Sequence, residues 1–566
     1  MEPNQVTRLD AKRREEVLRA LRDFPKEPHR LLDALHVVRN ECGAIDAAAE
    51  KAIAEHLGLM HGRVAETVSF YSYLTLGRKL IRPCTGLSCV LRGGDKLLTE
   101  LQQEHADGWS VLEVPCLGRC EMAPIALVGA EVVPHATPET CRESAARGGD
   151  GSLRGPVGEP QSREWKSIPL GEPVADIEAW RALGGLQALE RVTSGELTGQ
   201  QVIDELNASG LVGCGGAGFP TGRKWAYMLP QRLEDRTVIV NADEGEPGTF
   251  KDRWVMERNP FALVEGALIA ARAIQAIEVI IYVREEYDES IDRCRHAIDE
   301  FREAGLLGAI DAWVAVGAGA YICGEETALL ESLEGRRGMP RLKPPYPVEV
   351  GYLGRPTLIN NVETLAHVPA ILREGGAWFA GLGVRGGKGV RLFSLSGDVE
   401  RPGVYELPAG TTARELIEEH AGGVPGGRSV KAWVPGGAAT GFLSAAELDV
   451  PMDIPTLREA GGALGSAAVI VLDETRSVRD ACTELLRFFE EESCQQCTPC
   501  RLGTRALHHL LRRADADVPD GTPGFVQRVD VALKQTSICG LGMAAGVPLL
   551  TGMRFFPEEF KGFSDG

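Results

Sequence analysis

The segment Thr237-Val-Ile-Val-Asn-Ala-Asp-Glu-Gly-Glu-Pro-Gly-Thr-Phe-Lys-Asp-Arg253 places an apolar strand directly before a loop of polar side chains. The alternation of elements continues along the chain, with helical runs at 260–276 and 290–304 and apolar strands at 278–283 and 312–316. This pattern is typical of a parallel sheet with crossover helices. Ligands bind such sheets at the carboxyl ends of the strands, so we expect the polar loop to line a binding site.

The chain has 566 residues, enough for several domains. Gly, Ser, Pro and charge without hydrophobic periodicity, at 146–167, are typical of a linker. We expect a helical segment and small α/β unit at 1–145, an α/β core at 168–389, a small α+β module at 390–473 and a helical bundle at 474–566. Within these units the patterns predict helices at 18–39, 47–57, 94–104 and 412–419, and strands at 110–114, 125–128 and 131–133.

Composition excludes several classes of protein. Lys+Arg 61 against Asp+Glu 80 gives a net charge of −19 without a long basic run, so nucleic acid is not expected as a partner. Residues 1–16 carry no apolar core, and the apolar stretches 262–283 and 538–553 are interrupted by charges or by Gly and Pro. We therefore expect a soluble, cytoplasmic protein without a transmembrane segment. In a reducing compartment, its fourteen cysteines are better suited to metal ligation than to disulfides.

Two sets of cysteines have the spacing of iron-sulfur ligands. Cys494, Cys497 and Cys500 lie three residues apart and Cys539 can supply a distant fourth thiolate, which suits a 4Fe-4S cluster. The pairs Cys84/Cys89 and Cys116/Cys120 offer two thiolates to each iron of a 2Fe-2S cluster. Zinc is the alternative metal for either set of cysteines. Most of the remaining six cysteines are expected to be small buried apolar side chains: Cys42, Cys141, Cys214, Cys294, Cys323 and Cys482.

A glycine loop at Gly213-Cys-Gly-Gly-Ala-Gly218 precedes a helical run at 221–229. It contains G-x-G-x-x-G but lacks the strand that leads into a Rossmann fingerprint. Backbone amides at a helix start can cradle a phosphate, and Lys224 on the next turn would add positive charge. The alternative is a tight turn selected only for its dihedral angles.

Two acidic loops follow strands of the predicted sheet. Asn241 and Asp243 could hydrogen-bond a flavin edge or a nicotinamide carboxamide. In Tyr321-Ile-Cys-Gly-Glu-Glu-Thr327 the paired carboxylates could accept from ribose hydroxyls and would repel the extra phosphate of NADP. A solvated cap or turn is the alternative for each loop.

Taken in order, these segments carry a family resemblance. Together with Arg341-Leu-Lys-Pro-Pro-Tyr-Pro347 and Asn360-Asn-Val-Glu-Thr364, they make residues 200–560 resemble the flavin-bearing NADH-oxidising subunit of respiratory complex I. Residues 25–145, with Glu66-Thr-Val-Ser-Phe-Tyr-Ser-Tyr73, resemble the thioredoxin-like 2Fe-2S subunit of the same systems, fused in front. The fusion most resembles the diaphorase subunit of soluble NAD-reducing nickel-iron hydrogenases. Next come the corresponding subunits of NAD-dependent formate dehydrogenases and bifurcating hydrogenases.

The resemblance implies a fold class and a set of site residues. The fold is multidomain α/β: a thioredoxin-like 2Fe-2S domain, a Rossmann-like FMN- and NAD-binding domain, a ubiquitin-like β-grasp module and a helical 4Fe-4S bundle. FMN would be held by Gly213, Gly215, Gly216, Gly218, Lys224, Asn241, Asp243, Asn360 and Asn361. NADH would stack between Phe219, Tyr227 and Tyr346, with further cofactor contacts from Glu246, Tyr321, Gly324, Glu325, Glu326 and Lys343.

Three positions depart from the family pattern. Cys214 stands where Arg is usual, Gln495 where Gly is usual, and Tyr346 where Phe is common. None of these changes removes a cluster ligand.

The implied activity is hydride transfer from NADH to FMN, with single electrons passing on to the 4Fe-4S cluster. Glu244 and Glu246 are the candidates for catalytic contact at the flavin edge. Iron-sulfur and catalytic subunits of a larger redox complex are the expected partners. The alternatives are the equivalent subunit of a formate dehydrogenase or another molybdenum or tungsten oxidoreductase, of a bifurcating enzyme or of complex I, and a non-catalytic zinc-stabilised scaffold. Thiol-disulfide exchange is disfavoured because the thioredoxin-like segment has no C-x-x-C.

Overall fold

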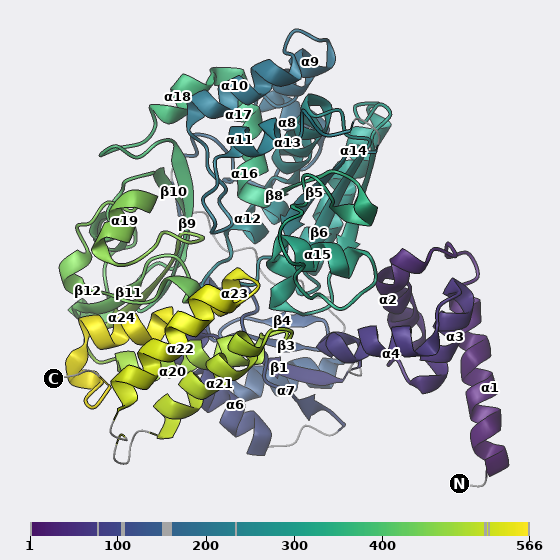
Figure 1. Cartoon of the computed structure of the whole chain (residues 1–566), viewed down its shortest axis with the longest axis horizontal. Helices are drawn as coiled ribbons and strands as arrows, with labels where there is room; N and C mark the ends of the chain where they lie inside the picture. The colour runs from purple at the N-terminus through teal and green to yellow at the C-terminus, as the bar shows by residue number, and fades with distance from the viewer. Residues whose placement is uncertain are drawn as a thin grey trace.

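The computed structural model describes residues 3–75, 79–103, 108–149, 161–162, 164–232, 235–513, 518 and 521–563. Figure 1 shows the N-terminal helices in purple as an arm on one side of the molecule and the C-terminal helices in yellow on the other. The described residues form three sheets, of which one is parallel and two combine parallel with antiparallel pairs. Most of the predicted linker, residues 150–160 and 163, lies outside the described residues, as does residue 104 at the end of a predicted helix.

The N-terminal arm is helical, as expected, but it is divided differently. Its helices are α1 (Pro3–Ala20), η1 (Pro28–Arg30), α2 (Leu31–Cys42), α3 (Ala47–Leu57), α4 (His61–Phe70) and η2 (Ser72–Leu74). The prediction of one helix over 18–39 was wrong, because α1 ends at Ala20 and α2 begins at Leu31. Pro25 and Pro28 lie in the gap, where each lacks the backbone N–H that a continuous helix needs.

The thioredoxin-like unit has a small mixed sheet in the order β2-β1-β3-β4. Its elements are β1 (Leu80–Pro83), α5 (Leu87–Leu91), α6 (Gly94–Gln103), β2 (Ser110–Val111), η3 (Cys120–Met122), β3 (Ala126–Val128), β4 (Glu131–Val133) and α7 (Pro138–Arg147). The predicted strand 110–114 is shorter in the structure. Beyond Val111 only Val114 pairs again, as an isolated bridge to Cys84, because the chain turns into Pro115 and the cysteine loop.

The α/β core has a parallel sheet in the order β7-β6-β5-β8, built from β5 (Thr237–Ala242), β6 (Glu278–Val283), β7 (Asp311–Val316) and β8 (Thr357–Asn361). The helices before β5 are α8 (Ile177–Ala182), α9 (Gln187–Thr193), α10 (Gly199–Ser209) and α11 (Thr221–Ala226). Between the strands lie α12 (Lys251–Arg258), α13 (Pro260–Ala273), α14 (Asp288–Glu303), η4 (Tyr321–Gly324), α15 (Glu326–Leu333) and η5 (Tyr352–Gly354), and after them α16 (Val362–Ala366), α17 (Val368–Glu374) and α18 (Gly376–Ala380). Since β5 is central, its polar loop lies between the ends of β6 and β8.

The third unit is a five-stranded sheet in the order β10-β9-β13-β11-β12, in which only the β13–β9 pair is parallel. Its elements are β9 (Val390–Gly397), β10 (Gly403–Pro408), η6 (Glu415–His420), η7 (Pro425–Gly427), β11 (Val430–Val434), η8 (Ala438–Thr440), β12 (Leu443–Ser444), η9 (Ala445–Glu447), α19 (Ile454–Ala460) and β13 (Ala468–Asp473). The first and last strands pair at the centre of the sheet, which is the arrangement of a β-grasp.

The C-terminal bundle contains α20 (Val478–Glu491), α21 (Thr498–Arg513), α22 (Thr522–Thr536), α23 (Gly540–Ala544), α24 (Val547–Phe555) and η10 (Pro557–Glu559). Leu485, Leu486 and Phe489 repeat at helical spacing and are buried, so the predicted amphipathic pattern of α20 forms the core of the bundle. None of the helices in the described residues is both long and apolar enough to span a bilayer.

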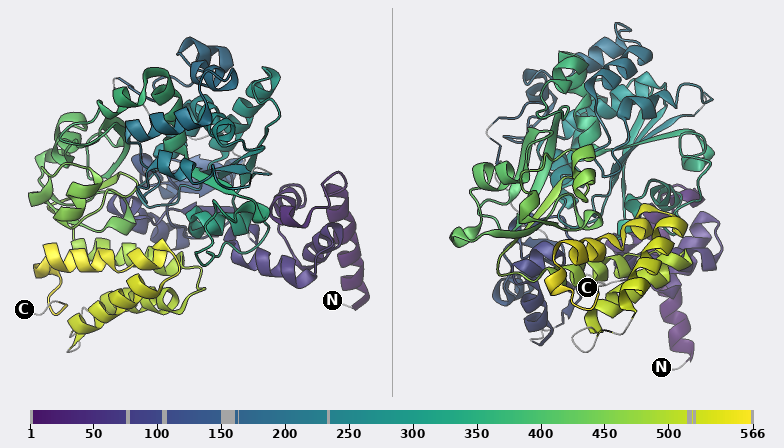
Figure 2. Two further views of the ribbon diagram at one scale, coloured as in Figure 1. Left: turned by 45° about the horizontal axis from the view of Figure 1, so that its top comes forward. Right: turned by 60° about the vertical axis from the view of Figure 1, so that its left-hand side comes forward.

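Figure 2 shows the ribbon of the thioredoxin-like unit next to the C-terminal bundle in both views. Direct contacts join this unit to the other units. Ser88 and Ser396 hydroxyls lie 2.9 Å apart, and Arg92 donates to the carbonyl oxygen of Gly397 at 2.9 Å. Arg476 donates to Leu91 of the thioredoxin-like unit and pairs with Asp398 of the β-grasp unit. The cysteine loops therefore face the interior of the molecule rather than solvent.

Candidate functional site

The glycine loop forms a closed turn between α10 and α11. The Gly213 amide donates to the Phe219 carbonyl at 2.8 Å, and the loop tip from Gly215 to Ala217 is exposed. Gly216 has φ +117°, and a Cβ built there meets only the Gly465 backbone, at 4.0 Å. Gly218 has φ +64°. The loop is thus open where a bulky anion would lie, and it follows a helix rather than a strand, as the sequence indicates.

The polar ends of two neighbouring strands meet beside this loop. Register pairs Asn241 of β5 with Asn361 of β8. Trp225 of α11 donates to Asn360 Oδ1 at 3.0 Å, and Asn241 Nδ2 donates to the Gly324 carbonyl at 2.8 Å. The four predicted residues Asn241, Gly324, Asn360 and Asn361 therefore lie together at one edge of the sheet.

Asp243 supplies an unused acceptor at the same edge. Its Oδ2 atom is buried and has no hydrogen-bond partner among the described residues. Burial raises the pKa of this carboxyl well above its ordinary value. Because a buried polar atom without a partner is costly, the site fits a ligand that donates a hydrogen bond here, as a flavin ring can. The open glycine loop and this oxygen together fit FMN.

Two lysines neutralise the paired carboxylates of the second acidic loop. Lys224 Nζ lies 3.3 Å from Glu326, and Lys343 Nζ lies 2.9 Å from both Glu325 and Glu326. Burial works to raise the pKa of Glu326, but the two lysines hold it below its ordinary value. The paired carboxylates therefore lie against two lysines in the structure, and their preference for NADH over NADPH stays a prediction.

The three predicted aromatic side chains, Phe219, Tyr227 and Tyr346, are exposed. Phe219 and Tyr227 have ring centroids 6.3 Å apart, and Tyr346 is 51% exposed. Exposed aromatic rings of this size offer stacking surfaces for a base or a nicotinamide. The structure thus brings Phe219 and Tyr227 together and leaves Tyr346 accessible.

Glu246 links the α/β core directly to the β-grasp unit and, through Tyr321, to the C-terminal bundle. Its carboxylate accepts from the Tyr321 hydroxyl and from the Ala439 amide, the latter at 2.8 Å. Tyr321 packs edge-on against Phe488 of α20, with centroids 4.9 Å apart. Ala439, from the glycine-rich loop of the β-grasp unit, was not among the predicted residues, because no local pattern marks its distant partner.

Glu244 faces away from this contact. Its carboxylate accepts from the amides of Asp252 and Arg253, at 2.8 and 3.0 Å, at the start of α12, and from the Tyr287 hydroxyl at 3.2 Å. Burial and the nearby Asp252 raise the pKa of Glu244 to about 8. These bonds cap a helix and use both carboxylate oxygens.

The first cysteine set converges inside the thioredoxin-like unit. Cys84, Cys89, Cys116 and Cys120 are each at most 5% exposed. The sulfurs of Cys116 and Cys120 lie 3.6 Å apart, and the Cys84 thiol interacts with those of Cys89 and Cys116. Four buried sulfurs facing one another fit a small inorganic core.

The second set lies where α20, α21 and α23 meet. Cys494 and Cys497 precede α21, Cys500 lies in its first turn, and Cys539 directly precedes α23. Burial raises the pKa of Cys500 to about 12, and repulsion from the other three thiols adds to that rise. Gln495 has φ +61°, in the left-handed region that favours glycine, so the glycine usual in the family matches the backbone better than Gln does.

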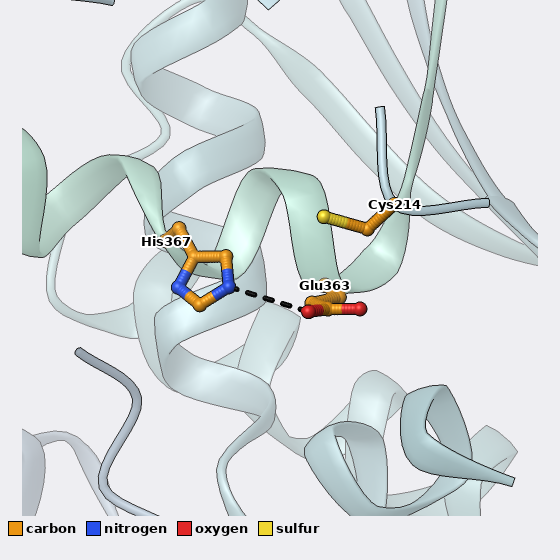
Figure 3. Close-up of side chains that lie close together, drawn as sticks. All are labelled: Cys214, Glu363 and His367. Atoms are coloured by element: carbon orange, nitrogen blue, oxygen red, sulfur yellow. Dashed lines mark ion pairs between the residues drawn. The ribbon is translucent and has the colours of Figure 1, made fainter. Parts of the chain in front are cut away.

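Cys214, Glu363 and His367 bring a sulfur, an oxygen and a nitrogen within 4.8 Å of one another (Figure 3). Two cations already serve this group: Arg391 Nη1 lies 2.6 Å from the Cys214 sulfur, and Lys251 Nζ lies 2.8 Å from Glu363. The group is therefore a buried ion network rather than a metal centre. Cys214 is buried as predicted, but it also accepts a hydrogen bond, which the expectation of a simple apolar side chain missed.

Replacing Lys251 by Met is expected to lower the free energy of unfolding by about 3–5 kcal/mol, because Glu363 and Asp252 would lose their buried counter-charge. Burial alone would raise the pKa of Glu363, and Lys251 holds it well below its ordinary value instead. The stabilisation by the Lys251–Glu363 pair is therefore fully present above the pKa that Glu363 has in the unfolded chain. It is lost as the pH falls from there through the lower pKa that Glu363 has in the folded protein. Urea unfolding at pH 7 and at a pH below the unfolded pKa of Glu363 should show that the difference in free energy of unfolding between wild type and variant becomes smaller. A difference that stays constant would contradict this account.

Comparison with known proteins identifies these units. Four family models match the chain: the Nuo51 FMN-binding domain at residues 206–370, the thioredoxin-like [2Fe-2S] ferredoxin at 17–147, the NADH-ubiquinone oxidoreductase-F iron-sulfur binding region at 480–562 and the SLBB domain at 392–443. The class that the fold and the matches define is a flavoprotein with two iron-sulfur sites. The cofactors are thus FMN, a 2Fe-2S cluster and an iron-sulfur cluster in the bundle, and the zinc alternative is set aside.

The F 2 subunit of NADH-quinone oxidoreductase from Rhizobium meliloti (strain 1021) is 45% identical over 395 residues, covering 68% of this chain and 93% of the relative. The NADP-reducing hydrogenase subunit HndC of Solidesulfovibrio fructosivorans is 39% identical over 400 residues, covering 69% and 81%. A crystal structure of an NAD+-reducing [NiFe]-hydrogenase in the H2-reduced state matches with TM-score 0.83 and 30% identity, over 96% of this chain and 94% of that one. The chain belongs to the family of NADH-quinone oxidoreductase F subunits.

Proposed function

We propose that this chain is the diaphorase subunit of an NAD-reducing hydrogenase and works in the cytoplasm. One observation carries the choice of complex. The Rhizobium meliloti relative aligns with 68% of the chain, whereas the hydrogenase structure matches 96% of it. A match over 96% of the chain must include the thioredoxin-like unit. Eight cysteines that must stay available as metal ligands suit a reducing compartment. The equivalent subunit of another NAD-dependent complex is the alternative.

The site residues have distinct proposed roles. When bound, FMN accepts two electrons as hydride from NADH and releases them singly. Gly213, Gly215, Gly216 and Gly218 leave room for the phosphate, and Asp243, Asn241, Asn360 and Asn361 orient the flavin ring. Lys224 helps to hold FMN, and Lys343, Glu325 and Glu326 contact NADH. Phe219, Tyr227 and Tyr346 stack on NADH. Glu246 takes the flavin-edge role, while we assign helix capping to Glu244.

Tyr321 connects the nucleotide side of the site with the bundle. Its hydroxyl contacts Glu246, and its backbone amide donates to Glu492 Oε2 at 3.0 Å, two residues before Cys494. We propose that this contact keeps the cluster cysteines close to the flavin. Proton transfer by a side chain is not needed for hydride transfer, so these residues act by positioning.

Anaerobic affinity purification of the chain from its native host, with metal analysis and mass spectrometry of co-purifying proteins, tests the proposal. We expect nickel, hydrogenase subunits and bleaching of the flavin absorbance by NADH. Molybdenum or tungsten would move the chain to a formate dehydrogenase or a related complex. A flavin-free protein that NADH does not reduce would overturn the diaphorase role itself.

A further inference from the structure

Arg284 lies directly after β6, at the binding edge of the sheet, and is 7% exposed. Its guanidinium donates in two directions. Nη1 donates to the carbonyl oxygen of Glu244 at 2.5 Å, and Nη2 donates to the carbonyl oxygen of Cys116 at 2.9 Å. One side chain therefore bridges the polar loop of the α/β core and a cysteine of the 2Fe-2S set.

The bridge carries a buried positive charge. Glu286 accepts from Nε at 3.1 Å and from Nη2 at 2.7 Å. Burial would raise the pKa of Glu286, and Arg284 holds it below its ordinary value, so the pair is ionised at neutral pH.

A second arginine contacts the same cysteine loop within a larger ion network. Arg253 Nε donates to the Gly118 carbonyl at 3.0 Å, and its guanidinium pairs with both Glu121 and Glu257. Glu257 also pairs with Arg119 at 3.4 Å, so two arginines share two carboxylates there. Arg284 has one carboxylate partner among the ion pairs of the described residues and is the arginine that donates to a cysteine carbonyl.

We propose that Arg284 is a positioning residue that sets the reduction potential of the 2Fe-2S cluster while it holds the cysteine loop against the flavin-side loop. The inference rests on the proposed function. Reduction adds negative charge to the cluster, and a nearby buried cation stabilises that charge because the local dielectric constant is low. Removing the cation should therefore make the cluster harder to reduce, and removing its carboxylate partner should make it easier.

The test is an EPR-monitored redox titration of both clusters in the purified full-length protein, in wild type and in three variants. Arg284→Gln should shift the 2Fe-2S midpoint to a more negative potential, and Glu286→Gln should shift it to a more positive one. Arg284→Lys keeps the charge and should shift it less than Arg284→Gln. The midpoint of the 4Fe-4S cluster should shift less than that of the 2Fe-2S cluster in all three, because Arg284 donates to the Cys116 carbonyl within the 2Fe-2S set.

Arg236→Gln is the matched control. Arg236 is also buried, but it donates to carbonyl oxygens of Arg232, Ile274 and other residues at the opposite end of β5. This variant should lower stability and leave both potentials unchanged.

An unchanged 2Fe-2S midpoint in Arg284→Gln with full iron content would overturn the inference, as would equal shifts in Arg284→Gln and Arg236→Gln. If Arg284→Gln does not fold, a Glu286→Gln midpoint that is unchanged or more negative overturns it. A wild-type protein that carries no 2Fe-2S signal would instead contradict the proposed function.

Discussion

Replacing Cys497 by Ser is expected to abolish the 4Fe-4S EPR signal and to reduce NADH-driven electron delivery to partner subunits to background, while NADH still bleaches the flavin. Cys497 lies in the loop before α21, so the change removes a thiolate ligand without deleting a core side chain. The proposed hydride site consists of other residues, at the edge of the parallel sheet. The Cys497→Ser variant should therefore retain flavin reduction by NADH and lose electron delivery to partner subunits.

Cys482→Ala is the control for this experiment. Cys482 is fully buried in α20 and lies outside the cluster set, so its loss should cost stability and leave the EPR signal in place. Flavin bleaching with an intact cluster signal in Cys497→Ser would show that Cys497 is not a ligand. Loss of both flavin reduction and the signal would show that the two sites do not separate.

Replacing Gly216 by Val is expected to weaken FMN binding by about 100-fold or more. A residue other than Gly at φ +117° costs roughly 1–3 kcal/mol, and the new side chain would occupy the space that the phosphate needs. Because a Cβ there meets only the Gly465 backbone at 4.0 Å, protein atoms would not clash with it. Titration of deflavinated protein with FMN, followed by flavin fluorescence, measures the change.

Gly305→Val tests whether backbone strain alone accounts for the loss. Gly305 has φ +72° and nothing within 4 Å of a built Cβ, and it follows α14, away from the loop. It should lose stability and bind FMN normally. Equal FMN affinity in Gly216→Val and wild type would contradict the phosphate cradle.

Local patterns in the sequence were enough to predict the parallel strands and both cysteine sets. Strands 278–283 and 312–316 are short apolar runs between amphipathic helices, and the structure has them at Glu278–Val283 and Asp311–Val316. Such patterns reflect interactions between residues close along the chain, so they can be read without the fold. The break at Pro25 and Pro28 was missed although the sequence marks it, because two prolines and a mostly charged stretch at 22–30 interrupt the apolar pattern.

The tertiary structure alone decided which distant residues meet. Strand order places Asn361 beside Asn241, the fold brings Lys224 and Lys343 onto Glu326, and Ala439 approaches Glu246 from another unit. Lys343 and Glu326 are 17 residues apart, and the other contacts join segments more than 100 residues apart, so no local spacing encodes them. The sequence by itself determined most of the elements, the grouping of eight cysteines into two sets and the family resemblance. Packing of the units determined which charges are neutralised, because burial and pairing depend on the whole fold.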